Sequence, residues 1–457
     1  ALLFSVSFKS HPMKIDRPDR RQFLKKTSLG LLGAGLVSGK QPYSFSSEQE
    51  EMPRKITGYR TLGRTGFKVS SLGFGRPTNP AVLRAGIQSG INYFDTAPGY
   101  GSSQQDIGSI IHEFDRKSVF ITTKVHASAL GDKDHILGIV RKSLETLKVD
   151  YVDCFQMQGA DSLGMLKHQG FHDAYAQLKQ EGRVRFCGIA CHGSYFPGNP
   201  EDTMENILLS AINDGRFDLL LVVYNFLHFE QGERVLKAAA GKNIATTIMK
   251  SNPVKMFNMF KEYEAQYKAN GEDFPERWKP VLEAFRGHNE KAMQYIEDQG
   301  IVDHDELLRD VATRFVLDNE QAHCVLIDFR SFDDLESHIR YAGDPFTADA
   351  REKLDFYRKI FSAVHCRIGC NACQLSCPHH VPVNTILRYH YYFAVKQQEK
   401  HAMDKYRGLP GNKPDVCVDC PGYCEKACPH DVLTRPLLAM AHQDLSFKDP
   451  HHSTATS

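Results

Sequence analysis

The sequence predicts an α/β protein: a (β/α)8 TIM barrel followed by a small α-helical domain with two cysteine quartets. Two observations predict this. From Tyr59 to about Gly343, short apolar runs alternate with longer amphipathic stretches, as in strand-helix units around a parallel sheet. Eight of the 12 cysteines lie between Cys366 and Cys428, which indicates a cofactor bound by that segment.

The barrel is predicted from eight strand candidates, several of them apolar with little alternation, as expected for strands buried on both faces. A closed barrel explains both their number and their burial. The candidates are Val69 to Gly75, Gly90 to Asp95, Ser118 to Lys124, Tyr151 to Gln158, Val184 to Cys191, Phe217 to Tyr224, Asn243 to Lys250 and His323 to Ile327. Helices are predicted at Asp134 to Leu147, Gly170 to Gln180, Pro200 to Asp214 and Asp305 to Leu317.

The domain boundaries follow from these patterns. We expect the barrel at 56–345, with an insertion at 251–303 that follows the seventh strand. That insertion leaves from the rim where barrel active sites lie, so it is a lid, a docking surface for the C-terminal domain, or a decoration. The cysteine-rich domain is expected at 355–440, with a tail at 441–457.

The N-terminal extension, 1–50, carries an export pattern. Arg20 and Arg21 precede a Gly-rich, mildly apolar run from Thr27 to Gly39, which resembles a twin-arginine signal. The run is shorter than the roughly 20 residues that a stable membrane span needs. We expect a periplasmic or otherwise exported protein; a basic disordered N-terminus is the alternative.

The overall charge argues against a nucleic-acid partner. Lys plus Arg number 56 and Asp plus Glu number 55, so the chain has no general positive field that would gather phosphate backbones.

The cysteine spacing is the strongest chemical signal. Cys366, Cys370, Cys373 and Cys377 form one quartet closed by Pro378, and a second, closed by Pro429, comprises Cys417, Cys420, Cys424 and Cys428. The pattern resembles bacterial ferredoxins, in which the fourth cysteine of each run binds the partner cluster. We therefore expect a ferredoxin-like domain with two 4Fe-4S clusters, in which Cys377 and Cys428 are exchanged. Zinc sites and disulfides are the alternatives.

The barrel resembles the aldo/keto reductase family. The resemblance rests on motifs that include the runs from Gly90 to Ala97, from Ile121 to Lys124 and from Gly182 to Gly188, and the cysteine domain points to the iron-sulfur branch. It implies a small-molecule carbonyl or alcohol substrate and NADP(H). It also implies a catalytic Tyr100 whose pKa is lowered by Lys124, with Asp95 as the counter-ion of that lysine.

The sequence departs from the family at the fourth catalytic position. Gln158 stands where the family has His, and an amide can orient a carbonyl but cannot take up a proton. His126 and His192 are neighbouring candidates to compensate, or ordinary loop histidines.

The nicotinamide contacts depart as well. The resemblance places Tyr224, Arg330 and Ser331 at the cofactor site, but Asp328 and Asp334 flank Arg330 and would repel a ribose phosphate. NADP(H), NAD(H), another electron donor or no nicotinamide all stay open.

Two functions follow. One is an oxidoreductase that acts on a carbonyl or alcohol in the barrel and relays electrons through the clusters to or from a redox partner protein. The other is a barrel without aldo/keto reductase turnover that serves as an electron-transfer or binding scaffold.

Overall fold

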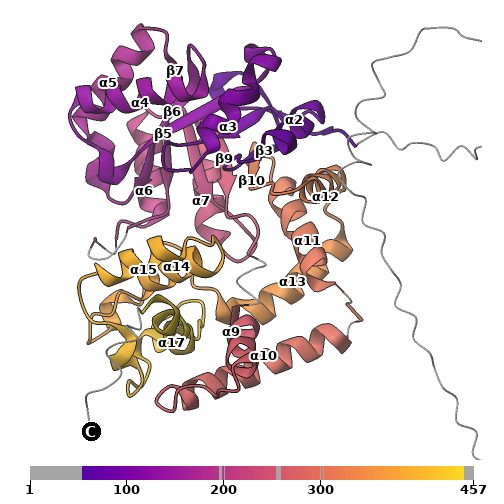
Figure 1. Cartoon of the computed structure of the whole chain (residues 1–457), viewed down its shortest axis with the longest axis vertical. Helices are drawn as coiled ribbons and strands as arrows, with labels where there is room; N and C mark the ends of the chain where they lie inside the picture. The colour runs from indigo at the N-terminus through magenta and orange to yellow at the C-terminus, as the bar shows by residue number, and fades with distance from the viewer. Residues whose placement is uncertain are drawn as a thin grey trace, which may run out of the picture.

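Eight parallel strands close into the predicted barrel, in the order β10-β3-β4-β5-β6-β7-β8-β9 (Figure 1). The computed structural model describes residues 54–194, 198–199, 201–253, 259–298, 300–301 and 303–446; the export pattern and most of the tail lie outside them. The strands are β3 Leu72–Phe74, β4 Tyr93–Asp95, β5 Phe120–His126, β6 Val152–Ala160, β7 Val184–Cys191, β8 Leu219–Val223, β9 Ala245–Met249 and β10 Cys324–Ile327.

Each predicted strand overlaps an observed one, although β5 and β6 each extend two residues past the predicted end and the first predicted strand is divided. Its beginning forms β2 (Lys68–Ser70), which pairs antiparallel with β1 (Tyr59–Thr61), and its end forms β3. Leu62 and Val69, at this hairpin, are buried together with side chains that fill the barrel interior. The hairpin therefore closes the N-terminal end of the barrel, and the opposite end is left for chemistry.

Helices between the strands cover the barrel. They are α2 Pro80–Gln88, α3 Ser103–Ile110, α4 Lys133–Leu147, α5 Gln169–Gln180, α6 Met204–Asp214, α7 Glu230–Gly241, α11 His304–Asp318 and α12 Phe332–Gly343. Their starts follow ordinary capping: Asp132 accepts a hydrogen bond from the backbone N–H of His135 at the start of α4, so Asp134 lies in the first turn.

The regular elements of the C-terminal region, among its described residues, are all helices joined by loops. They are α13 Ala348–Phe361, α14 Val383–Ala394, α15 Glu399–Arg407, α16 Tyr423–Lys426 and α17 Thr434–Leu445, with short 3-10 turns between them. No helix among the described residues is both long and apolar enough to cross a membrane.

The insertion packs against this cysteine-rich region. Its helices, α9 (Met259–Ala269) and α10 (Lys279–Asp298), share one hydrophobic core with α13, α14 and α17 (Figure 1). Trp278 and Phe285 of the insertion are buried in that core with Leu438, and Arg277 donates to the carbonyl oxygen of Asp415 at 2.8 Å. Of the roles expected for the insertion, the contacts fit a docking surface.

The cysteine-rich region also lies on the C-terminal rim of the barrel. Gly369 packs against the backbone of His192 and Gly193, directly after β7. Asn371 donates to Ser194 Oγ at 2.8 Å, and Lys396 donates to Asp328 Oδ2, after β10, at 2.8 Å. The region that carries the quartets is thus fixed next to the end of the barrel where active sites form.

Gly369→Ala tests this contact. A Cβ atom at Gly369 would overlap the carbonyl oxygen of His192, and the backbone has a φ of 74°. We expect the free energy of unfolding to fall by about 1–3 kcal/mol, because steric overlap adds to backbone strain. Gly66→Ala is the control: its φ is 72°, but nothing lies within 4 Å of the added atom. Chemical denaturation measures the free energy of unfolding of both variants. An equal loss in the two would show that the close contact at Gly369 does not contribute to stability.

Candidate active site and cysteine centre

A buried ion pair lies at the centre of the barrel mouth. Asp95 ends β4 and Lys124 lies on β5, and Lys124 Nζ is 2.6 Å from Asp95 Oδ1. Lys124 Nζ also donates to the carbonyl oxygen of Thr96 at 3.0 Å, while Thr122 Oγ1 donates to Asp95 at 2.9 Å. Neighbouring parallel strands bring these side chains together because both residues lie toward their carboxyl ends.

Tyr100 lies beside this pair. It follows β4 in the turn that leads to α3, and Lys124 Nζ is 4.8 Å from the centre of its ring. Gln158, on β6, donates from Nε2 to the Tyr100 hydroxyl at 3.4 Å. The structure therefore brings together all four residues predicted as catalytic: Asp95, Tyr100, Lys124 and Gln158.

The predicted tuning of Tyr100 is wrong in direction. Burial raises the pKa of Tyr100 well above its ordinary value, and the carboxylates of Asp95 and Asp328 raise it further, against a lowering by Arg76. Lys124 contacts the ring face, and its ammonium is committed to Asp95. The phenol is therefore held protonated at neutral pH, as a neutral hydrogen-bond and proton donor.

A second group of charges surrounds Tyr100 at the rim. Asp328, after β10, lies 3.9 Å from Arg76 and 2.8 Å from Lys396 of the cysteine-rich region. The carboxylate that was expected to repel a cofactor phosphate is thus paired with cations from two directions.

In the part of the chain that the structure describes, neither His126 nor His192 forms a hydrogen bond with Tyr100. His126 Nδ1 accepts from the backbone N–H of Ser128 at 3.1 Å. Burial lowers the pKa of His126. Burial also lowers the pKa of His192, well below its ordinary value, and Lys250 and Arg388 lower the pKa of His192 further. Both imidazoles are therefore neutral at pH 7.

The residues predicted to hold a nicotinamide do not converge on Tyr100. Tyr224 is 2% exposed, its ring lies 5.4 Å from that of Phe315 in the helical layer, and its hydroxyl donates to Glu233 at 3.3 Å. Tyr224 is therefore a packing residue, a correction of its predicted role, because the ring points out of the barrel and not into its mouth.

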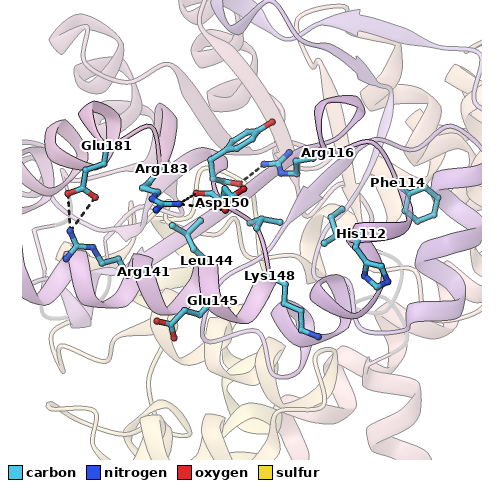
Figure 2. A pocket seen from close by; sticks show the side chains of 13 residues that line it. His112, Phe114, Arg116, Arg141, Leu144, Glu145, Lys148, Asp150, Glu181 and Arg183 are labelled. Carbon is cyan, nitrogen blue, oxygen red and sulfur yellow. Dashed lines mark hydrogen bonds and ion pairs between the residues drawn. The ribbon is translucent and has the colours of Figure 1, made fainter.

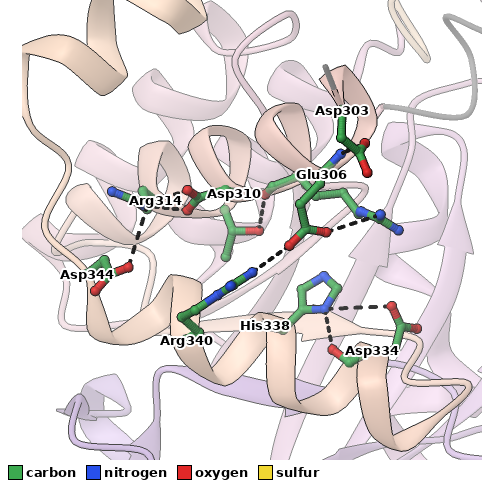
Figure 3. Close-up of polar contacts among 10 residues, drawn as sticks. Asp303, Glu306, Asp310, Arg314, Asp334, His338, Arg340 and Asp344 are labelled. Atoms are coloured by element: carbon green, nitrogen blue, oxygen red, sulfur yellow. Dashed lines mark hydrogen bonds and ion pairs between the residues drawn. The ribbon is translucent and has the colours of Figure 1, made fainter. Parts of the chain in front are cut away.

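Arg330 and Ser331 lie at the start of α12. Ser331 Oγ accepts from the backbone N–H of Asp334 at 3.1 Å and so caps the helix, while Asp334 Oδ2 accepts from the backbone N–H of Arg330 at 3.2 Å. Figure 3 shows the charges behind this turn, where Asp334 faces His338 and Glu306 bonds to Arg340 at 2.5 Å. The carboxylates of Glu306 and Asp334 both bond to groups of the protein itself, and Asp334 lies beside the exposed Arg330.

A cavity of about 720 Å³ lies elsewhere, beside the residues that precede β6 (Figure 2). In it, Arg141 pairs with Glu181 at 3.0 Å and Arg183 lies 3.9 Å from Asp150. Its charges are therefore largely compensated. It is at the N-terminal end of the strands, away from the catalytic group, where barrels ordinarily carry stability and not catalysis.

The eight C-terminal cysteines are free thiols that separate into two groups. Cys366, Cys370, Cys373 and Cys428 line one cavity. Burial raises the pKa of Cys417 to about 12, and Cys424, Cys377 and Cys420 lie near enough to raise it further. Each group thus takes three cysteines from one quartet and the fourth from the other, as the exchange of Cys377 and Cys428 requires.

Several sulfur atoms accept or share hydrogen bonds. Asn384 Nδ2 donates to Cys366 Sγ at 3.2 Å, and Cys424 Sγ lies 3.0 Å from Thr434 Oγ1. Hydrogen bonds to ligand sulfurs tune the reduction potential of iron-sulfur centres. Sequence reasoning missed both residues, because each is brought to its sulfur by the fold and not by the quartet spacing.

The two Cys-Pro segments also repeat one local structure. The backbone N–H of Val381 donates to Cys377 Sγ at 3.4 Å, and that of Val432 donates to Cys428 Sγ at 3.5 Å. The residue before each valine has a left-handed φ, 52° at His380 and 53° at Asp431. The shared Cys-Pro-His-x-Val sequence is the signal that predicts this repeat.

In the described residues, neither cysteine group is arranged as the ligand shell of a single metal ion. Among the described residues, no three His, Cys, Asp or Glu side chains converge as ligands of one metal ion do. A cubane is wider than an ion, so its thiolates surround a space. The cavity lined by Cys366, Cys370, Cys373 and Cys428 is about 20 Å³, so these side chains must move apart to ligate a cluster.

Comparison with known proteins establishes the class of the barrel. The model of the aldo/keto reductase family matches residues 61–357, more than half of the chain and ending before Cys366. The chain belongs to the aldo/keto reductase family, whose oxidoreductases include the relatives below.

The chain is similar to known members of the family over most of their length. The chain is 24% identical to L-galactose dehydrogenase of Arabidopsis thaliana over 303 residues, 61% of this chain and 86% of that protein. It is also 24% identical to the aldo-keto reductase YhdN of Bacillus subtilis over 341 residues, 68% and 96%. The holo form of aldo-keto reductase AKR11C1 from Bacillus halodurans aligns with a TM-score of 0.46 at 19% identity, covering 66% of this chain and 95% of that one.

Lys124→Met tests the buried ion pair. Removing the ammonium leaves Asp95 charged, buried and without its partner, so we expect the free energy of unfolding to fall by about 3–5 kcal/mol. The double variant, in which Asp95→Asn is added, removes both charges and should recover much of that loss. Urea denaturation of both variants measures this; a double variant no more stable than Lys124→Met would contradict the pairing.

Proposed function

We propose that this protein is an exported iron-sulfur oxidoreductase of the aldo/keto reductase type. A carbonyl or alcohol reacts in the barrel mouth, and two 4Fe-4S clusters relay electrons between that site and a redox partner protein. The observation that carries the proposal is the grouping of Cys428 with Cys366, Cys370 and Cys373, since a cluster shared between two quartets requires that arrangement.

The barrel residues have defined tasks in this proposal. Tyr100, kept protonated by burial, donates its hydroxyl proton to the developing alkoxide oxygen. Gln158 Nε2, 3.4 Å from that hydroxyl, orients the carbonyl oxygen, and the Asp95–Lys124 pair holds the ring from its face. As the phenolate forms, the Lys124 ammonium beside the ring stabilises its charge.

The cysteine-rich region supplies the electron path. When bound, each cluster passes one electron at a time. The cysteine group that includes Cys428 is next to the rim, because Gly369 and Asn371, between its ligands, contact the loop after β7. Arg367, buried beside this group, places a positive charge near the sulfurs, which favours the reduced cluster.

Export and nicotinamide use are separate parts of the proposal. The twin-arginine pattern around Arg20 and Arg21 suits a protein that folds around its cofactors before transport. Family membership supports NADP(H) or NAD(H) as the hydride source, whereas the placement of the Asp334 carboxylate beside Arg330 argues against a 2'-phosphate.

The second candidate is a scaffold that transfers electrons without carbonyl turnover. The specific observation in its favour is the rim contact, since Lys396 and Gly369 of the cysteine-rich region lie over the ends of β10 and β7. Turnover of Tyr100 variants separates the two candidates.

The cluster assignment is tested by paired substitutions. Cys428→Ser should remove about half of the iron in anaerobically reconstituted protein, since it damages one of two clusters. Adding Cys366→Ser should remove little more, because both residues serve one cluster. Adding Cys417→Ser to Cys428→Ser should remove most of the remaining iron, because the two then damage different clusters.

Iron and sulfide analysis with the visible absorbance spectrum measures these outcomes. Cys187→Ser, at a buried cysteine of the barrel, is the control and should keep all the iron. If Cys428→Ser with Cys417→Ser loses no more iron than either alone, the exchange is wrong, and a colourless, zinc-containing native protein removes the clusters altogether.

Tyr100→Phe tests the enzyme. We expect carbonyl reduction to fall at least about 100-fold, the contribution typical of a general acid, with iron content unchanged. Tyr175→Phe, at a tyrosine of the outer helix α5, is the matched control and should keep turnover. Unaltered turnover in Tyr100→Phe would favour the scaffold.

A further inference from the structure

A third lysine stands at the rim, outside the group described so far. Lys250 follows β9 directly, and its half-buried side chain extends between the barrel mouth and α14. Its Nζ atom lies 3.8 Å from the centre of the Tyr391 ring and 5.9 Å from that of Tyr392. The amine therefore faces the space where the two parts of the protein meet.

Lys250 lacks the counter-ion that the other lysines of the rim have. Lys124 lies 2.6 Å from Asp95, and Lys396 lies 2.8 Å from Asp328. Among the residues that the structure describes, no carboxylate oxygen lies within 4.0 Å of Lys250 Nζ. An ammonium in this position is stabilised mainly by the faces of two aromatic rings.

The surroundings of Lys250 favour the neutral amine. Burial lowers its pKa well below the ordinary value, and the positive charges of Lys396 and Arg388 lower it further, opposed by Asp328. A lysine that is desolvated and next to other cations is the standard arrangement for an amine nucleophile in enzymes. His192 is neutral and near enough to Lys250 for the lysine charge to lower its pKa, so its imidazole can serve as a proton acceptor.

The backbone at Lys250 is held in an uncommon conformation. Its φ is 56°, in the left-handed region, and Asn225 Nδ2 donates to its carbonyl oxygen at 2.8 Å. Such strain persists where the surrounding structure enforces it, often at functional sites. The backbone conformation at Lys250 is thus a second, independent feature that is common at functional sites.

We propose that Lys250 is a carbonyl-capturing amine, which binds an aldehyde or ketone covalently as an imine. The Nζ lone pair attacks the carbonyl carbon, and the carbonyl oxygen takes up a proton to give a carbinolamine. The carbon–oxygen bond then breaks, water leaves, and a carbon–nitrogen double bond forms after the nitrogen loses its protons. The step consumes no oxidant or reductant and needs neither cluster nor nicotinamide, so it goes beyond the function proposed above.

Reductive trapping tests this capture. The full-length protein is incubated at pH 7 with glycolaldehyde and reduced with borohydride, and its peptides are analysed by mass spectrometry. We expect a mass increase equal to the probe less one oxygen atom, at Lys250 at least about tenfold above Lys148, the factor that one pKa unit gives. Lys148 is the internal standard: its φ is 54°, also left-handed, but its side chain is exposed.

Variants separate capture from simple accessibility. Lys250→Arg keeps a cation on the Tyr391 ring but cannot form the imine, so labelling of that peptide should disappear. Lys148→Met should leave labelling at Lys250 unchanged. Labelling that follows exposure, with Lys148 equal to or above Lys250, would overturn the proposal.

The pH dependence gives a second readout. The charged groups that face Lys250 are Lys396 and Arg388 of the cysteine-rich region and Asp328 after β10, and the neutral, titratable His192 lies after β7. Lys396→Met removes a cation and releases Asp328, so we expect the pH midpoint of labelling to rise. A midpoint unmoved by Lys396→Met and equal to that of Lys148 would contradict the assignment. If the native protein contains no iron but is still labelled at Lys250, the imine proposal stands and the proposed electron relay is wrong.

Discussion

The approach of two backbones, at Gly369 and at His192-Gly193, sets the relation between the two halves of this protein. Any side chain at Gly369 would overlap a carbonyl group there, so the contact exists only with glycine. Around it, Asn371, Arg388 and Lys396 bond to the loops after β7 and β10. The barrel mouth and the nearer cysteine group are therefore parts of one structure, and the electrostatics of the rim include charges from both.

That shared rim explains why the catalytic group differs from expectation. The sequence correctly indicated that Asp95, Tyr100, Lys124 and Gln158 meet, because strand ends of a parallel barrel converge. The direction of the Tyr100 pKa shift could not be predicted from the convergence of strand ends. It depends on burial and on the carboxylates of Asp95 and Asp328, which outweigh the opposing effect of Arg76.

Much of the fold was predictable because strand burial leaves a strong pattern. Apolar runs marked all eight barrel strands, whereas the division at Ser71 between β2 and β3 depended on hairpin pairing that no local pattern records. Tyr224 was misassigned for a related reason: a residue just after a strand can face the mouth or the helical layer, and packing against Phe315 decides. The cysteine spacing predicted that Cys428 lies with Cys366, Cys370 and Cys373, but not the hydrogen bonds of Asn384 and Thr434 to the sulfur atoms.

The electron count of the proposed chemistry constrains how the parts cooperate. Carbonyl reduction consumes two electrons, while one cluster passes one, so a single quartet cannot complete the reaction from its own store. In the proposed protein, two clusters together would hold the pair, and each would take one cysteine from the other quartet. Because Gln158 cannot take up a proton, the protons must come from groups that burial keeps neutral, chiefly the Tyr100 phenol. Burial of Tyr100 keeps its phenol protonated, and the cysteine-rich region lies at the same rim of the barrel, where Gly369 meets His192.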